Sequence, residues 1–180
     1  MLKTIITIEK SIDIQTIIKG SALKKQSDTE FILVNDKKEL ARITISEGYV
    51  TFSYDGSLKF SEYEQIHNAI LTFSQETDGS IDDSGSKLGF LDNGEPAYII
   101  TNWSKWTEML NKAKYKTLEG QMVRVVDKSG NELGNGMLVD YKFKESVNLT
   151  SVISECTLIT LLGERKYQGD VLFIEPTGQW

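Results

Sequence analysis

Histidine and cysteine are almost absent from this sequence, which contains one of each, His67 and Cys156. A single cysteine cannot form an internal disulfide, so nothing indicates an oxidising compartment. Structural zinc sites use about four cysteine or histidine ligands, and a zinc site is therefore not expected. A catalytic Cys–His pair would require the two residues to meet in space. We expect instead that Cys156 packs within a strand and that His67 lies at the surface of a helix.

Long apolar runs are also absent. No stretch approaches the ~20 apolar residues of a membrane-spanning helix. The first residues alternate between apolar and polar types and reach charge at Glu9 and Lys10, so no secretory signal is expected and we predict a cytoplasmic protein. Phosphate-binding glycine loops are missing, and Gly134-Asn135-Gly136 lacks the third glycine and the following helix of a dinucleotide fingerprint. We therefore expect no cofactor and no enzyme of a familiar type.

An excess of positive charge is missing too, since the net charge is −6. Residues 1–95 contain 16 acidic and 10 basic side chains, whereas residues 96–180 contain 10 of each. An acidic surface repels nucleic acid in general but is attracted to a basic surface of a partner. Solubility alone also explains such a surface, so the charge distribution leaves both interpretations open.

The residues that are present predict an α+β fold rich in strands. Hydrophobic residues make up 39% of the chain, which is enough for a core. Alternating β-type runs at 3–9, 31–35, 40–46 and 49–54 predict a first strand and then an antiparallel meander. The stretch 11–20 is ambiguous between strand and helix.

Two amphipathic helices are predicted next to this meander. Ser61 and Glu64 have the spacing of a capping box, which predicts a helix that begins there and ends near Ser74. Its buried face should carry four residues at three- and four-residue spacing: Tyr63, Ile66, Ile70 and Phe73. A second helix should begin at Asn102 or Ser104 and bury Trp103 and Trp106 on one face.

Residues 75–95 are rich in glycine, serine and aspartate, and they predict a mobile acidic loop. Its alternating oxygen ligands are similar to those of a calcium loop, but Asp83 stands at the glycine position and Gly89 at the glutamate position, so no metal site is expected. Flexible carboxylates can instead contact arginine and lysine on a partner. The predicted partner-binding residues are Glu76, Asp78, Asp82, Asp83, Asp92 and Glu95.

After Gly120 the pattern changes to strands separated by glycine-marked turns. The runs 122–126, 133–144, 156–162 and 171–174 predict a small SH3-like β-barrel. We therefore predict an acidic α+β lobe over residues 1–118 and a small barrel-like lobe over residues 119–180. In this barrel, basic and aromatic residues offer an alternative, nucleic-acid-binding surface: Arg124, Lys142, Lys144, Arg165, Lys166 and Tyr167.

In composition, the chain is similar to acidic accessory proteins of phages and mobile elements, including anti-CRISPR and other anti-defence inhibitors and toxin-immunity proteins. That similarity implies an inhibitory binding protein whose partner is another protein, such as a defence nuclease with a basic nucleic-acid-handling surface. The alternatives are a nucleic-acid-binding module built on the barrel, a toxin-immunity protein, and a hydrolase or transferase with an unfamiliar site.

Overall fold

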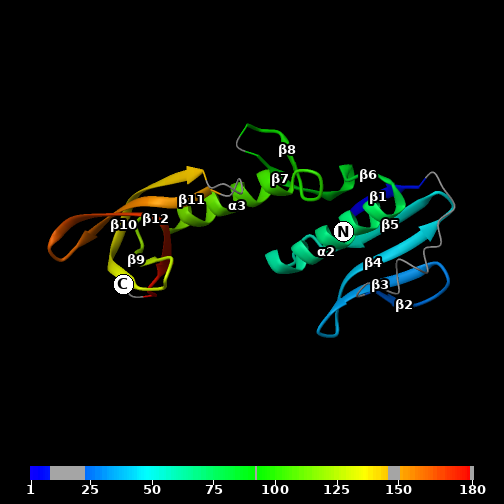
Figure 1. The fold of residues 1–180 in the computed structure, drawn as a ribbon, viewed down its shortest axis with the longest axis horizontal. Helices are drawn as coiled ribbons and strands as arrows, with labels where there is room; N and C mark the ends of the chain where they lie inside the picture. Colours follow the sequence, from blue (N-terminus) through cyan, green and yellow to red (C-terminus); the bar gives the residue numbers. More distant parts are fainter. Residues whose placement is uncertain (9–22, 92, 146–150, 179–180) are drawn as a thin grey trace. The chain divides into compact units, whose positions relative to one another are not determined.

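The computed structural model describes residues 1–8, 23–91, 93–145 and 151–178 (Figure 1). The ambiguous stretch 11–20 lies outside these residues. The chain divides into two compact units, Met1–Trp106 and Thr107–Trp180, and each is described here by itself. The division falls within helix α3 (Trp103–Leu118), whereas the boundary predicted at 118/119 follows the end of that helix. The α+β class, with two helices and antiparallel strands among the described residues, is confirmed.

The first unit is built on an antiparallel sheet with the strand order β2-β3-β4-β5-β1-β6. The predicted meander is confirmed as three consecutive hairpin-connected strands. A short strand precedes the meander, because Leu23 pairs with Leu33 along the edge of the sheet. The strands are β1 (Leu2–Thr7), β2 (Leu23–Lys25), β3 (Glu30–Asn35), β4 (Lys38–Ser46), β5 (Tyr49–Tyr54) and β6 (Ser80–Asp82).

Helix α2 (Phe60–Thr77) lies against one face of this sheet (Figure 1). The four residues predicted for its apolar face are all buried, and the Phe73 ring meets that of Phe52 edge-on at 5.9 Å. The predicted capping box is wrong. The cap is Lys59, whose amide donates to the Glu62 carboxylate at 2.8 Å. Glu62 also pairs with Lys38 of β4 at 2.7 Å, so a tertiary ion pair helps fix where the helix begins.

The segment after α2 is not the mobile loop that its composition predicts. It contains β6, a 3₁₀ turn (Ser84–Ser86) and the hairpin strands β7 (Lys87–Phe90) and β8 (Pro96–Tyr98). β6 pairs with β1, and β7 pairs with β8. Buried polar groups of this segment bond to other protein groups, whereas those of a mobile loop would bond to water; the buried Ser86 hydroxyl, for example, donates to the Asp83 carbonyl. Strand β8 ends at Tyr98, five residues before α3 begins.

The second unit contains four strands, β9 (Met122–Asp127), β10 (Glu132–Glu145), β11 (Ser151–Thr160) and β12 (Gly163–Pro176). They pair in a closed cycle, β9–β10–β11–β12–β9, which we call the four-stranded ring. β12 begins earlier than the predicted run 171–174, and the β11–β12 turn falls at Leu161 and Leu162.

The core of the four-stranded ring is apolar and includes the last turns of α3. The Tyr115 ring lies 6.1 Å from that of Tyr141 and 5.8 Å from that of Phe143. The buried members of this core are Tyr115, Leu118, Val123, Val125, Leu138, Ile153, Cys156, Leu158, Leu172 and Ile174. Across the residues that the structure describes, neither helix combines the length and the apolar composition needed to span a membrane.

Candidate functional site

The acidic residues predicted to bind a partner lie at the end of α2 and in the elements that follow it. Glu76, Asp78, Asp82 and Glu95 are exposed, and none of them forms an ion pair within the described part of the chain. The carboxyl end of a helix carries partial negative charge, so Glu76 and Asp78 concentrate negative potential there. Asp92 lies outside the described residues. The exposed carboxylates remain available to a partner.

Asp83 differs from the other predicted acidic residues because it is buried. Its carboxylate accepts hydrogen bonds from the Thr101 amide at 2.8 Å, the Thr101 hydroxyl at 3.0 Å and the Ile100 amide at 3.3 Å. These bonds tie the 3₁₀ turn to the segment that leads into α3. The carboxylate is therefore used within the fold and does not serve as a contact for a partner.

Most of the basic residues proposed for nucleic-acid binding have acidic partners on the ring itself. Arg124 pairs with Glu175 at 2.8 Å across β9 and β12. Lys142 and Lys166 both pair with Glu155, at 2.8 and 2.9 Å. A cation that already has a carboxylate partner offers less attraction to phosphate, because the local potential is close to neutral.

The remaining residues of that set are arranged differently. Lys144 lies 3.9 Å from Asp170, at the limit of an ion pair. Arg165 is exposed and has no acidic partner within the described part of the chain. Tyr167 packs against the core of the ring, so its face is not available to stack on a base. The structure does not assemble the six residues into a basic, aromatic surface.

The Glu155 cluster predicts an acid-dependent contribution to stability. Lys142, Lys166 and Gln168 lower the pKa of Glu155 from 4.5 to about 2. The unfolded chain takes up this proton near pH 4.5, so the stabilisation is complete above that pH and is lost as the pH falls towards 2. We expect Glu155→Gln to flatten the pH dependence of the free energy of unfolding between these values. Urea unfolding at a series of pH values checks this, and an unchanged slope would contradict it.

Cys156 and His67 belong to different units, and each has its own buried environment. Burial raises the pKa of the Cys156 thiol to about 11, which leaves almost no thiolate at neutral pH. Its predicted place among strand residues is confirmed. The prediction of a surface histidine is wrong. His67 is 9% exposed, and its ring stacks on Trp103 with centroids 4.5 Å apart.

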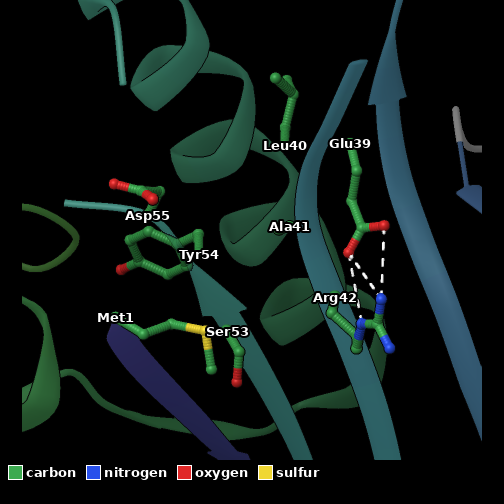
Figure 2. A pocket seen from close by; sticks show the side chains of 8 residues that line it. All are labelled: Met1, Glu39, Leu40, Ala41, Arg42, Ser53, Tyr54 and Asp55. Carbon is green, nitrogen blue, oxygen red and sulfur yellow. Dashed lines mark hydrogen bonds and ion pairs between the residues drawn. The ribbon is translucent and has the colours of Figure 1, made fainter. Parts of the chain in front are cut away.

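A cavity of about 520 Å³ lies at one end of the sheet, between β4 and the end of β5 (Figure 2). Figure 2 shows the Glu39 carboxylate joined to the Arg42 guanidinium, at 3.2 Å. Ser57 donates to Asp55 at 2.6 Å and holds the pKa of that carboxyl below its usual value. The Tyr54 hydroxyl is hydrogen-bonded to Thr4, and burial raises its pKa to about 12.

A second cavity, of about 560 Å³, lies beside the start of α3. Its lining includes the side chains of His67 and Trp103 and the residues that open the helix. The predicted packing role of Trp106 is confirmed, because this ring is 2% exposed and its indole N–H donates to the Leu88 carbonyl at 3.2 Å. Trp103 is only partly buried and remains part of the cavity wall.

The four-stranded ring exposes apolar side chains along its outer face. Met137 pairs with Ile159 on one side and with Met122 on the other, and each of the three is 37–39% exposed. Leu161 and Leu162 form the tip of the β11–β12 hairpin and are 106% and 81% exposed. We call these five residues the apolar row and tip. The predicted strand run 156–162 placed both leucines inside a strand and missed their exposure, although two adjacent leucines beside a glycine were a visible signal.

Comparison of the chain with protein-family models, with curated proteins and with solved structures finds no match.

Proposed function

We propose that this is a non-enzymatic binding protein that docks on another protein through the apolar row and tip. The observation that carries the proposal is the exposure of Leu161 and Leu162. Burial of a fully exposed leucine contributes about 1.5–3 kcal/mol. Large exposed apolar patches on soluble proteins commonly mark interaction sites.

The tip is held in a defined conformation, which favours a docking role. The Thr160 hydroxyl donates to the Gly163 carbonyl at 2.8 Å, and the Leu162 amide donates to the Thr160 hydroxyl at 3.1 Å. Gly163 adopts a φ of 93°, a conformation that other residues rarely take. A tip that is already ordered loses little conformational freedom on binding, so more of the burial energy appears as affinity.

We further propose that the partner has a basic surface, as a nuclease or another nucleic-acid-handling protein of a defence system does. The supporting observation is that Glu76, Asp78 and Asp82 are exposed and unpaired within the described ranges. Such carboxylates steer association with a basic surface. Direct nucleic-acid binding is less well supported, because the ring cations are paired. We also propose that the four-stranded ring is an SH3-like barrel.

The test is binding to a partner captured from a host extract, identified and then purified. We expect Leu161→Ser with Leu162→Ser to weaken the affinity at least ~tenfold, because each serine removes apolar area from the interface. The matched control is Phe90→Ser, which removes an apolar side chain of 58% exposure from the first unit. Calorimetry measures the three affinities.

The salt dependence of the same affinity tests separately whether the protein docks through the apolar row and tip and whether the partner surface is basic. Replacing Glu76, Asp78 and Asp82 with their amides should reduce the affinity and flatten its dependence on salt if the partner surface is basic. If the leucine replacements weaken the affinity and the acid replacements do not, docking through the apolar row and tip is supported and a basic partner surface is contradicted. Unchanged affinity in the leucine variant would overturn docking through the apolar row and tip.

A further inference from the structure

The cavity beside α3 combines three groups that attract negative charge. It is lined by His67 and Leu71 of α2 and by the consecutive residues 100–105, which lead into the first turn of α3. All of these residues belong to the first unit. Much of the lining is apolar, and in such surroundings an electrostatic contact is stronger than it is in water.

The first group is the amino-terminal end of α3, a helix of 16 residues. The Trp106 amide donates to the Asn102 carbonyl at 2.9 Å, which makes Asn102 the residue that caps the helix. The amides that follow a cap have no acceptor within their helix. For Trp103 and Lys105, no acceptor is found elsewhere in the described part of the chain either. Such amides, with the positive end of the helix dipole, bind oxyanions.

The second group is the imidazole of His67, which is nine-tenths buried and lines the cavity. Its Nδ1 atom has no hydrogen-bond partner among the residues that the structure describes. Asn68 and the backbone of Ile100 favour the protonated ring, but neither completes a hydrogen bond to Nδ1. A buried polar atom without a partner costs about 1–3 kcal/mol, so a ligand that supplies the missing partner is favoured.

The third group is the ammonium of Lys105, which belongs to an exposed residue of the cavity lining. Two carboxylates oppose it. Glu64 lies close enough to His67 to favour its charged form, and Asp83 occupies the amides of Ile100 and Thr101. Because both repel an anion, we expect an affinity in the millimolar range for a simple ion.

We propose that this cavity binds an oxyanion, a carboxylate or a phosphate-like group, between the Trp103 and Lys105 amides at the start of α3, the Lys105 ammonium and the protonated His67 ring. The site is in the first unit and is independent of docking through the apolar row and tip. Binding requires protonation of His67, whose pKa is lowered mainly by burial. Affinity therefore rises as the pH falls, because the ring must gain a proton that its buried position disfavours.

The test uses sulfate and acetate as probes, with the imidazole resonances of the only histidine as the signal. Both probes stay ionised between about pH 5.5 and pH 8, so a change in affinity reports on the protein. We expect saturable shifts whose affinity is at least ~fivefold tighter at the lower pH, with the intrinsic tryptophan fluorescence, to which Trp103 contributes, changing in parallel. Sulfate binding without acetate binding identifies a phosphate-like ligand, and the reverse identifies a carboxylate.

Two variants and a control complete the design. Lys105→Met and His67→Gln should each weaken binding ~3–10-fold, as expected for loss of one charge-assisted contact. Because His67→Gln removes the imidazole signal, intrinsic tryptophan fluorescence measures its affinity. Lys128→Met, which removes an exposed lysine from the second unit, should leave binding unchanged. Circular dichroism confirms that each variant is folded. Shifts that do not saturate with either probe, or equal affinities in Lys105→Met and Lys128→Met, would overturn the site.

Discussion

Gly136→Ala is expected to destabilise the four-stranded ring by about 2–4 kcal/mol. A Cβ atom at this position of β10 would lie 2.5 Å from the Ile159 carbonyl oxygen and 3.1 Å from its carbonyl carbon. These are backbone atoms of the neighbouring strand, so the clash is relieved only if β10 and β11 separate. Separation weakens the pairing beside Met137 and Ile159 and disturbs the apolar row as well.

Two other glycines provide graded controls for this prediction. At Gly134, the new Cβ would meet the hydroxyl end of the Tyr167 ring, and a side chain can shift more easily than the backbone of a paired strand. Gly134→Ala should therefore cost less than Gly136→Ala. At Gly56, the nearest atom is 4.0 Å away, so Gly56→Ala should change stability by less than about 0.5 kcal/mol. Urea unfolding measures all three, and equal costs at Gly136 and Gly56 would show that the strands tolerate the added carbon.

Asp83→Ala is expected to lower the free energy of unfolding of the first unit by about 2–4 kcal/mol. The change leaves the amides of Ile100 and Thr101 and the Thr101 hydroxyl without their acceptor. Hydrogen bonds to a charged acceptor are stronger than neutral ones, and the Ile100 amide is buried, so without Asp83 it has neither a protein partner nor water. Intrinsic tryptophan fluorescence follows the unfolding, because two of the three tryptophans, Trp103 and Trp106, belong to this unit.

Asp82→Ala is the matched control, because this neighbouring carboxylate is exposed and accepts only a local bond from the Ser84 amide at 3.0 Å. We expect a much smaller effect there. The loss of unfolding free energy in Asp83→Asn should lie between those of the two alanine variants, since the amide oxygen can still accept some of the hydrogen bonds from Ile100 and Thr101. Equal losses for Asp82→Ala and Asp83→Ala would mean that Asp83 is solvated in solution, and it would then rejoin the exposed acidic residues.

The parts of the fold that could be predicted from sequence are those set by local periodicity. The alternation in residues 31–54 predicted the meander, and the spacing of Tyr63, Ile66, Ile70 and Phe73 predicted the buried face of α2. In both cases, neighbours in sequence determine which face turns inward. The start of α2 was missed because Glu62 bonds to the Lys59 amide and to Lys38 of another element.

The functional surfaces were harder to predict, because they depend on partners that are distant in sequence. Asp83 resembles its acidic neighbours in composition, and only Thr101, 18 residues away, shows that it is buried. The pairing of Glu155 with Lys142 and Lys166 depends on strand register in the same way. His67 looked like a surface residue of an amphipathic helix until Trp103 covered its ring. Sequence therefore identified the charged and aromatic residues but not which of them remain exposed.

The place of β1 in the first sheet has a consequence for biosynthesis. β1 is made first but pairs on one side with β5, at residues 49–54, and on the other with β6, at residues 80–82. Local hairpins can form as the chain leaves the ribosome, whereas β1 must wait for both neighbours. Its alternating apolar residues stay unpaired during that interval. The nascent chain should therefore bind chaperones much less once Asp82 has left the ribosome. By then α2, which lies between β5 and β6 in sequence, can pack on the sheet.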